Sequence, residues 1–264
     1  AIKDLPEDLL VAARLIVHRR VYFDKVNFCY VLGEYHEPHA RAKIELQIRS
    51  LIAMESGFPT DRVYVMVSSS YDTYGTGEYG SLVSIQLRQP TKNVLQNARQ
   101  FLDMKNYWIS RVEVALDFDT RTGEDARAVD RTIVKYWRMG WPSRNAPSVQ
   151  YENGNYKIGL VDKNRQPTKR LGIIYSDRSS RMSKRECPCC HIEFRRISRK
   201  KIEPLGIKVV DDLLFFDHEK FLNNQFHLTS IDLKRLERFV LSINGANAQA
   251  NMVLSKLVQD NVED

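Results

Sequence analysis

Acidic side chains recur at alternating positions in the segment ISRVEVALDFD, residues 109–119. In a β-strand, Glu113, Asp117 and Asp119 would fall on one face, and apolar side chains would fall on the other. Asp117 and Asp119 would lie about 6–7 Å apart, close enough to share one ion. Glu113 and Asp117 would lie about 13 Å apart, which is too far for one ion to contact both directly.

A second segment, CHIEFRRI at residues 190–197, has the same alternation. Its apolar side chains point to a core, whereas His191, Glu193 and Arg195 share the opposite face. If the two strands are neighbours, at a spacing of about 4.8 Å, His191 and Glu193 come within reach of the first set of carboxylates. Carboxylates and a histidine on an open sheet face favour Mg²⁺ or Mn²⁺. The alternative is a metal-free polar face held by cross-strand Glu and Arg pairs.

Tyr175 stands near the end of another expected strand, LGIIYS at residues 171–176. A tyrosine hydroxyl can attack a phosphodiester when a metal polarises the phosphate and cations stabilise the developing charge. Tyr156, in NYKIGLV at residues 155–161, is an alternative nucleophile. With 12 tyrosines in the chain, a structural role is the default for each of them.

Positive charge is concentrated between residues 162 and 201, which contain 13 Lys or Arg and four Asp or Glu. The local charge is +9 in a chain whose total is +7, so the remaining residues sum to −2. Such a concentration is typical of nucleic-acid binding, because neutralised phosphates release counterions. A solvated loop and a patch for anionic membranes are the alternatives, but no amphipathic helix accompanies the segment. We predict DNA contacts by Arg178, Arg181, Lys184, Arg185, Arg195 and Arg196.

Three of the four cysteines, Cys187, Cys189 and Cys190, lead into the second acidic strand. Structural zinc usually takes two separated pairs of ligands, and C-x-C-C-H cannot readily close one tetrahedron alone. His36 and His39 are candidates for a second pair, but no spacing pattern links them to the cysteines. We expect small, partly buried thiols, and zinc binding stays open. The cysteines do not form a secreted disulfide framework, which indicates a reducing cytoplasm.

The chain has 264 residues, enough for one large or two small domains. Hydrophobic residues make up 43% and charged residues 28%, as in ordinary folded proteins. No stretch approaches the roughly 18 consecutive apolar residues of a membrane span, so we expect no membrane partner. The first 20 residues suggest an amphipathic helix rather than a signal peptide.

Helix-like and strand-like segments alternate along the chain. Apolar periodicity and turn residues predict helices at 9–17, 40–55, 91–104 and 122–138, and strands at 25–32, 62–71, 80–87, 108–118, 155–161, 171–176 and 191–197. The fold class expected is α+β, a central, mostly antiparallel sheet with helices on one face, plus a C-terminal helical region. We expect an α+β nucleic-acid-processing domain at 1–205 and a helical extension at 206–264, with helices at 229–242 and 247–260.

Three segments together resemble a pattern found in rolling-circle replication initiators of plasmids and phages and in related conjugative relaxases. They are SRVEVALDF, LGIIYSDRSS and CHIEFR. The family has Thr/Ser-Arg-x-Asp-x-Ala-x-Asp, then R-x-Y-D/S, then a strand with x-R-x-E. The order is the same here, and the resemblance covers roughly residues 80–200. Glu113 stands where the family often has Asp.

The resemblance implies nicking and joining of single-stranded DNA at an origin through a tyrosyl-phosphate intermediate, with a divalent metal. Carried over by position, it makes Asp117 and Glu193 metal-site carboxylates and Tyr175 the candidate nucleophile. Together with the strand patterns, it predicts an Mg²⁺ or Mn²⁺ site formed by Asp117, Glu193, Glu113, Asp119 and His191.

Two other functions fit the same residues. A non-catalytic, sequence-specific DNA-binding protein would use the basic segment and the C-terminal helices, and its acidic face would be structural. A primase-like, metal-dependent nucleotidyltransferase would also place an Asp-x-Asp, here Asp117 and Asp119, on a sheet, although no P-loop motif is present. DNA is the expected partner in the preferred function, with a homodimer as an additional assembly.

Overall fold

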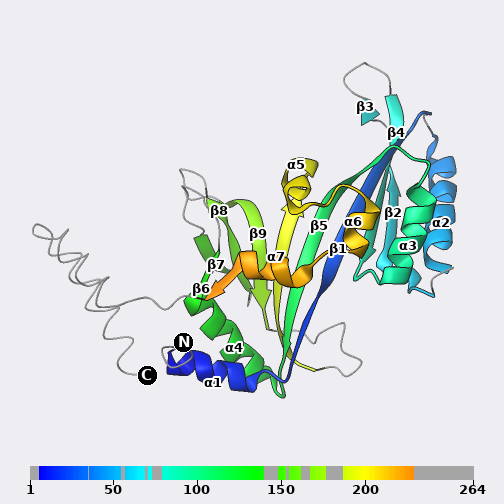
Figure 1. The fold of residues 1–264 in the computed structure, drawn as a ribbon. Helices are drawn as coiled ribbons and strands as arrows, with labels where there is room; N and C mark the ends of the chain where they lie inside the picture. Colours follow the sequence, from blue (N-terminus) through cyan, green and yellow to red (C-terminus); the bar gives the residue numbers. More distant parts are fainter. Residues whose placement is uncertain are drawn as a thin grey trace, which may run out of the picture.

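A computed structural model describes residues 6–34, 36–54, 57–68, 71–72, 79–139, 148–152, 155–161, 167–176 and 187–228. Its centre is a nine-stranded antiparallel sheet in the order β2-β4-β1-β5-β10-β9-β8-β7, with β3 paired to β4 (Figure 1). The strands are β1 (His18–Leu32), β2 (Val63–Val67), β3 (Tyr71–Asp72), β4 (Tyr79–Arg88), β5 (Tyr107–Asp119), β7 (Ser148–Glu152), β8 (Asn155–Val161), β9 (Pro167–Tyr175) and β10 (Cys189–Ile197). A separate pair joins β6 (Trp137–Met139) to β11 (Phe226–Leu228).

Helices cover one face of this sheet, which confirms the predicted α+β class. They are α1 (Glu7–Leu15), α2 (Pro38–Met54), α3 (Lys92–Leu102), α4 (Gly123–Tyr136), α5 (Arg199–Ile202), α6 (Val210–Leu214) and α7 (His218–Gln225), with short 3-10 turns η2 (Thr60–Arg62) and η3 (Glu203–Leu205). Helix α2 packs on β2, α3 lies against α2 and α6, and α1 lies against α4 (Figure 1).

Local sequence signals set where these helices begin. At α3, the Thr91 side chain accepts a hydrogen bond from the backbone N–H of Val94 at 3.3 Å. At α4, the Thr122 hydroxyl accepts from the Asp125 N–H at 3.1 Å, and the Asp125 carboxylate accepts from the Thr122 N–H at 3.2 Å. This reciprocal arrangement satisfies two backbone donors that a helix start leaves without partners. Thr122 and Asp125 therefore act together as the cap of α4.

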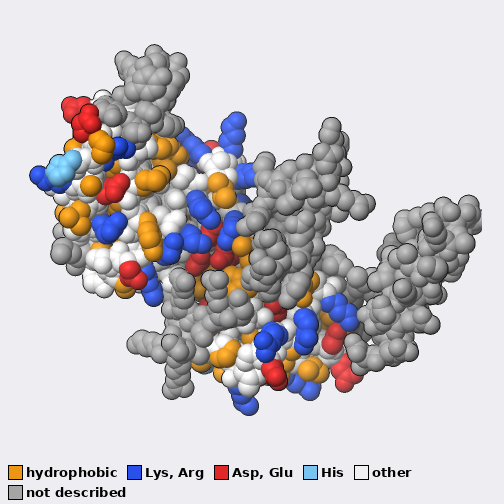
Figure 2. Space-filling model, turned by 180° about the vertical axis from the view of Figure 1, so that it is seen from behind, with side chains coloured by type: hydrophobic (Ala, Val, Ile, Leu, Met, Phe, Trp, Pro, Cys, Tyr) orange, Lys and Arg blue, Asp and Glu red, His pale blue; other side chains and the backbone are white. Residues whose placement is uncertain are grey.

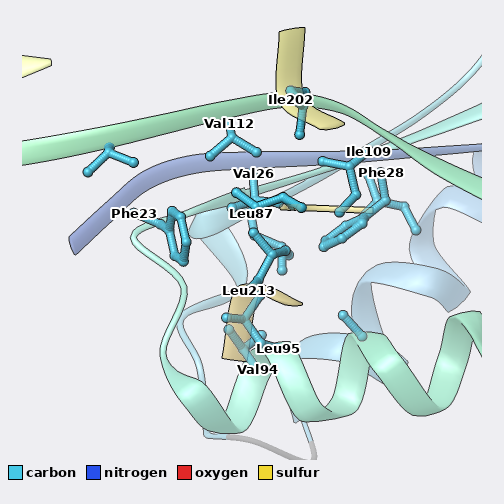
Figure 3. Close-up of a cluster of buried hydrophobic side chains, with 14 of the residues drawn as sticks. Phe23, Val26, Phe28, Leu87, Val94, Leu95, Ile109, Val112, Ile202 and Leu213 are labelled. Carbon is cyan, nitrogen blue, oxygen red and sulfur yellow. The ribbon is translucent and has the colours of Figure 1, made fainter. Parts of the chain in front are cut away.

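The hydrophobic core lies between the helices and the apolar face of the sheet (Figure 3). Val112, from the even-numbered face of β5, belongs to this core, as do Val94 of α3 and Leu213 of α6. Burial of side chains from one strand face and from several helices stabilises their mutual positions. The opposite face of β5 is therefore left to the acidic residues.

Helices α6 and α7 belong to the same core, through Leu213, Phe221 and Leu222. Arg196 of β10 also donates a hydrogen bond to Gln225 of α7 at 2.6 Å. The described part of the C-terminal region thus packs on the sheet. The domain division after residue 205 stays a prediction, and the helices expected at 229–242 and 247–260 lie outside the described residues.

None of the helices within the described ranges is long and apolar enough to cross a membrane.

Candidate functional site

The two acidic strands are neighbours, which is the condition on which the predicted cluster of side chains depended. In the antiparallel pair of β5 and β10, His191 lies opposite Asp117, and Arg195 lies opposite Glu113. Strand β9 follows on the other side of β10, where Tyr175 lies opposite His191. Asp117, His191 and Tyr175 therefore form one row across three strands, on the face turned away from the helices.

This polar face is more closed than expected. The prediction of open carboxylates on the sheet is wrong, since Glu113 and Asp117 are 0% exposed and Asp119, His191 and Glu193 are also buried. Seen from behind, acidic side chains gather in the middle of the face, between Lys and Arg side chains (Figure 2). Basic side chains from the same and neighbouring strands pair with the carboxylates. Paired burial of this kind offsets the cost of removing the charges from water.

One group of carboxylates, here called the Glu113 cluster, consists of Asp24, Glu113 and Glu193. One oxygen from each lies within 4.8 Å of the others. Asp24 comes from β1, where a register shift between Phe23 and Lys25 leaves it without a partner residue in β5. This bulge breaks the alternation of side chains along the strand.

Three cations surround Glu113. Lys25 donates to Glu113 at 2.5 Å, and the Arg111 and Arg195 guanidinium groups lie 2.8 and 3.1 Å from its other oxygen. Arg195 also donates to Glu193 at 2.9 and 2.5 Å. Burial alone would raise the pKa of Glu193, but the hydrogen bond from His191 and the nearby cations lower it to about 2. Glu193 is therefore ionised, and each carboxylate of this cluster is already paired with a cation.

The second group, here called the Asp119 cluster, consists of Asp117, Asp119 and Cys189. Their ligand atoms also lie within 4.8 Å of one another. Asp119 forms an ion pair with Arg20, but its Oδ1 atom is buried and has no hydrogen-bond partner in the described structure. Burial raises the pKa of Asp119, because the nearby Arg20 only partly offsets the cost of charging this side chain.

His191 links the two clusters. Its Nδ1 atom lies 2.5 Å from Asp117 Oδ1, and its Nε2 atom lies 3.3 Å from Glu193 Oε1. Burial alone would lower the pKa of His191, but the hydrogen bonds to Asp117 and Glu193 raise it to about 9. The ring is consequently a cation at neutral pH, and its two N–H groups orient both carboxylates.

Tyr175 lies against His191, with ring centroids 4.5 Å apart and planes inclined by 31°. The next residue, Ser176, donates to the buried Asp130 of α4 at 2.8 Å and so ties the end of β9 to that helix. Tyr156 of β8 pairs with Ile174, whose side chain is in the core, and Tyr156 packs against that core too. The two candidate nucleophiles therefore point to opposite faces of the sheet.

Strand β1 adds a tyrosine that sequence analysis missed. Tyr22 lies opposite Ala115 and donates to Asp117 Oδ2 at 3.0 Å. Burial and then the nearby Asp117 raise the pKa of Tyr22 far above its usual value. Tyr22 therefore serves as a hydrogen-bond donor to Asp117 and is a poor source of phenolate.

The five predicted metal ligands are thus divided. Asp117 and Asp119 fall in one cluster, as the two-residue spacing indicated, and Glu113 and Glu193 fall in the other. Divalent Mg²⁺ and Mn²⁺ prefer carboxylate oxygens. The unpartnered Asp119 Oδ1 fits such an ion, whereas the Glu113 cluster already has three cations in its place.

Of the predicted DNA contacts, Arg178, Arg181, Lys184 and Arg185 lie outside the described residues. Arg195 is engaged by Glu193 and Glu113. Arg196 points to the other face, where it is 5% exposed and contacts Gln225 and the Phe221 ring. Burial lowers the pKa of Arg196 to about 10. These positions indicate structural roles for Arg195 and Arg196.

The cysteines also divide by face. Cys190 is part of the hydrophobic core, whereas Cys189 is beside Asp117 and Asp119. Cys187 is half-buried, and none of these three described cysteines forms a disulfide.

No protein-family model and no curated protein matches this sequence. Among solved structures, the chain is similar to a rolling circle replication initiator protein from Geobacillus stearothermophilus, with 8% identity, 89% of this chain and 91% of that chain covered, and a TM-score of 0.40. It is also similar to the class II 3-hydroxy-3-methylglutaryl-CoA reductase from Streptococcus pneumoniae, with 10% identity, 96% and 78% covered, and a TM-score of 0.25. TM-scores this low establish neither a common family nor a common function.

Proposed function

We propose that this chain is a DNA-binding replication initiator that nicks and joins single-stranded DNA through a tyrosyl-phosphate intermediate. The observation that carries the proposal is the row of Tyr175, His191 and Asp117 on one face of the sheet. It brings a hydroxyl group, a cation and a buried carboxylate together. In the sequence, Tyr175 is followed by a strongly basic segment. The sequence resemblance to initiators and relaxases points to two of these residues, Tyr175 and Asp117.

The chemistry needs a phosphorus atom, a nucleophile and a leaving group. The Tyr175 oxygen attacks phosphorus and gives up its proton, the bond from phosphorus to one sugar oxygen breaks, and that oxygen leaves as a hydroxyl. Joining is the reverse step, in which a sugar hydroxyl attacks the tyrosyl phosphate and restores Tyr175. Bond energy is thereby kept in the protein–DNA ester between the two steps.

The residues around Tyr175 have distinct roles in this proposal. The charged His191 ring packs against Tyr175 and favours the negative charge that develops on its oxygen. Asp117 orients His191 through the 2.5 Å contact with Nδ1. A divalent ion, Mg²⁺ or Mn²⁺, held by Asp117 and Asp119 would polarise the scissile phosphate when bound. Glu113 and Glu193 hold the cations that support this arrangement.

Tyr175 is favoured over Tyr156 as the nucleophile because of the face on which it lies. Tyr156 packs against the hydrophobic core, on the side away from the carboxylates. A reacting phosphate on that side would have to displace packed apolar side chains, at a cost of several kcal/mol. Tyr175 lies against His191 on the opposite face, so its reaction requires no displacement of the hydrophobic core.

Phosphate binding falls, in this proposal, to the four cations that follow Tyr175 along the chain. Arg178 and Arg181 stand three and six residues after the nucleophile. Replacing either with Ala should weaken DNA binding about equally for all sequences and reduce the salt dependence of log K by about one unit. Arg196→Met, a change within the buried α7 contact, is the matched control and should leave the salt dependence unchanged. Fluorescence anisotropy at several salt concentrations measures both.

The experiment that tests catalysis is a covalent-adduct assay. End-labelled single-stranded DNA, from the native element or a randomised pool, is incubated with the wild type, Tyr175→Phe and Tyr156→Phe, with Mn²⁺ or with chelator. We expect a metal-dependent protein–DNA band in the wild type and in Tyr156→Phe, and none in Tyr175→Phe.

The other outcomes separate the alternatives. An adduct lost only in Tyr156→Phe would keep the enzyme and overturn the nucleophile. Tight binding that ignores chelator, with no adduct in any variant, would leave a non-catalytic DNA-binding protein. Incorporation of nucleoside triphosphates into a primer, again with no adduct, would instead establish the primase-like nucleotidyltransferase.

A further inference from the structure

The strand pairing brings one thiol next to two metal-site carboxylates. Cys189 lies directly opposite Asp119 in the pair of β10 and β5, and the Sγ atom lies within 4.8 Å of a carboxylate oxygen of Asp117 and of Asp119. Asp119 and Cys189 are each 1% exposed, and Asp117 is fully buried. Three potential ligands from two paired strands thus meet at one point below the surface.

The backbone around this point is held on both sides. The Thr120 N–H donates at 2.9 Å to the carbonyl of Pro188, the residue directly before Cys189. On the β1 side, the Val17 N–H donates to the Asp119 carbonyl at 2.8 Å. The ends of β5 and β10 are therefore fixed relative to each other, which keeps the thiol and the carboxylates in place without a bound ion.

One oxygen in this cluster still lacks a partner. Asp119 Oδ1 is buried and accepts no hydrogen bond from any described residue, whereas the same carboxylate is paired with Arg20 through Oδ2. Leaving a buried acceptor unsatisfied costs about 1–3 kcal/mol. A cation bound between Asp119, Asp117 and Cys189 would remove this cost. The unpartnered oxygen is an observation separate from the proximity of the three side chains.

We infer that Cys189 is a ligand of the ion held by Asp117 and Asp119, and that this site prefers Mn²⁺, Co²⁺ or Zn²⁺ to Mg²⁺. The inference rests on the proposed function only in taking this cluster as the metal site. Two carboxylates alone suit a hard ion, but a thiolate is a soft ligand that Mg²⁺ does not favour. The cysteine therefore changes which ion the site selects.

Metal binding at this site must release a proton. A cysteine binds a metal ion as a thiolate, so the Cys189 thiol has to lose its proton. A divalent ion displaces that proton into solvent as the sulfur becomes a ligand. His191 remains on Asp117 as an outer hydrogen-bond donor, the type of contact that commonly orients metal-binding side chains.

The test uses Co²⁺, which reports a sulfur ligand directly through a charge-transfer band in the near ultraviolet. The purified full chain is titrated with Co²⁺ as wild type, Cys189→Ser, Asp119→Asn and Cys187→Ser. We expect the band in the wild type and in Cys187→Ser, and its loss in Cys189→Ser, with Co²⁺ affinity reduced about tenfold or more. Mg²⁺ affinity, measured by competition, should change much less.

A measurement on the wild type alone covers the case in which Cys189→Ser fails to fold. X-ray absorption of the Zn²⁺-loaded protein should show one sulfur at about 2.3 Å. Oxygen and nitrogen neighbours only, or an unchanged Co²⁺ band in folded Cys189→Ser, would overturn the inference.

The failure of this inference is distinguishable from failure of the proposed function. A protein that forms the DNA adduct without any sulfur at the metal keeps its function and loses the Cys189 ligand. Conversely, a sulfur ligand with no adduct under any condition supports the metal site and removes the nicking activity.

Discussion

The Glu113 cluster and the Asp119 cluster lie on the same face of β5 and β10, with Asp24 of β1 added to the first, but their charges are compensated differently. Glu113 has both oxygens engaged, by Lys25 on one side and by Arg111 and Arg195 on the other. Asp119 has one oxygen paired and one without a partner in the part of the chain that is described. In both clusters the ligand atoms lie within 4.8 Å of one another. The compensating cations are what distinguish the ion-pair network around Glu113 from the proposed metal site at Asp119.

The largest expected effect on stability comes from breaking the ion pairs around Glu113. Glu113→Ala removes the shared partner of three partly buried cations, so the free energy of unfolding should fall by about 3–5 kcal/mol. Urea unfolding followed by circular dichroism measures it, with Glu113→Gln as the isosteric comparison. A loss below about 1 kcal/mol would mean that the network contributes no more than exposed ion pairs do.

His191 connects the two clusters, and its loss of a proton should lower the free energy of unfolding of the protein. Its pKa is raised from 6.5 to about 9 in the folded state, so its contribution is fully present below the unfolded value of 6.5 and is lost as pH rises through about 9. The loss should amount to about 3 kcal/mol. Unfolding free energies across this pH range test it, and the dependence should be absent in His191→Gln. A flat wild-type profile would contradict the two hydrogen bonds of this ring.

Metal binding should stabilise the fold through the Asp119 cluster only. Mn²⁺ at 100 times its dissociation constant should raise the free energy of unfolding by about 2.7 kcal/mol. Asp119→Asn should lose this gain, and Cys187→Ser, the half-buried neighbour outside the cluster, should keep it. If Asp119→Asn retains the gain and Glu113→Gln loses it, the ion binds in the other cluster.

The smallest effect is predicted for the same Asp119→Asn variant without metal. Burial already raises the pKa of Asp119, so replacing the charge by an amide removes an unfavourable term. Arg20 loses its partner but has 29% of its side chain exposed and can be hydrated. The free energy of unfolding should therefore change by less than about 1 kcal/mol. A loss comparable to that of Glu113→Ala would make Asp119 structural.

Alternation along two strands was sufficient to predict which acidic side chains meet on one face of the sheet. The odd-numbered positions of residues 109–119 and 190–197 carry the acids and His191, and the pairing of β5 with β10 brings them together. The same parity places Arg196 on the core face, although its basic neighbours in the sequence suggested a DNA contact. In a strand, the odd or even position of a residue predicts the face of its side chain better than the charge of its sequence neighbours does.

Strand β1 was predicted only from residue 25, and the site residues in its first half were missed. Arg19, Arg20 and Asp24 give the segment a polar, loop-like composition, yet it forms the first half of a 15-residue strand. The bulge at Asp24 also shifts the alternation, so the two-residue period fails there. Burial of the carboxylates could not be predicted either, because it depends on cations from several strands.

The central claim is that Tyr175 carries DNA during the reaction, and peptide mapping of the adduct tests it most directly. The wild-type protein is allowed to form the protein–DNA adduct with Mn²⁺, the DNA is trimmed by nuclease, and the modified peptide is identified by mass spectrometry. We predict a nucleotide on Tyr175, the last residue of β9. A nucleotide on Tyr156, on any other residue, or on none would contradict it.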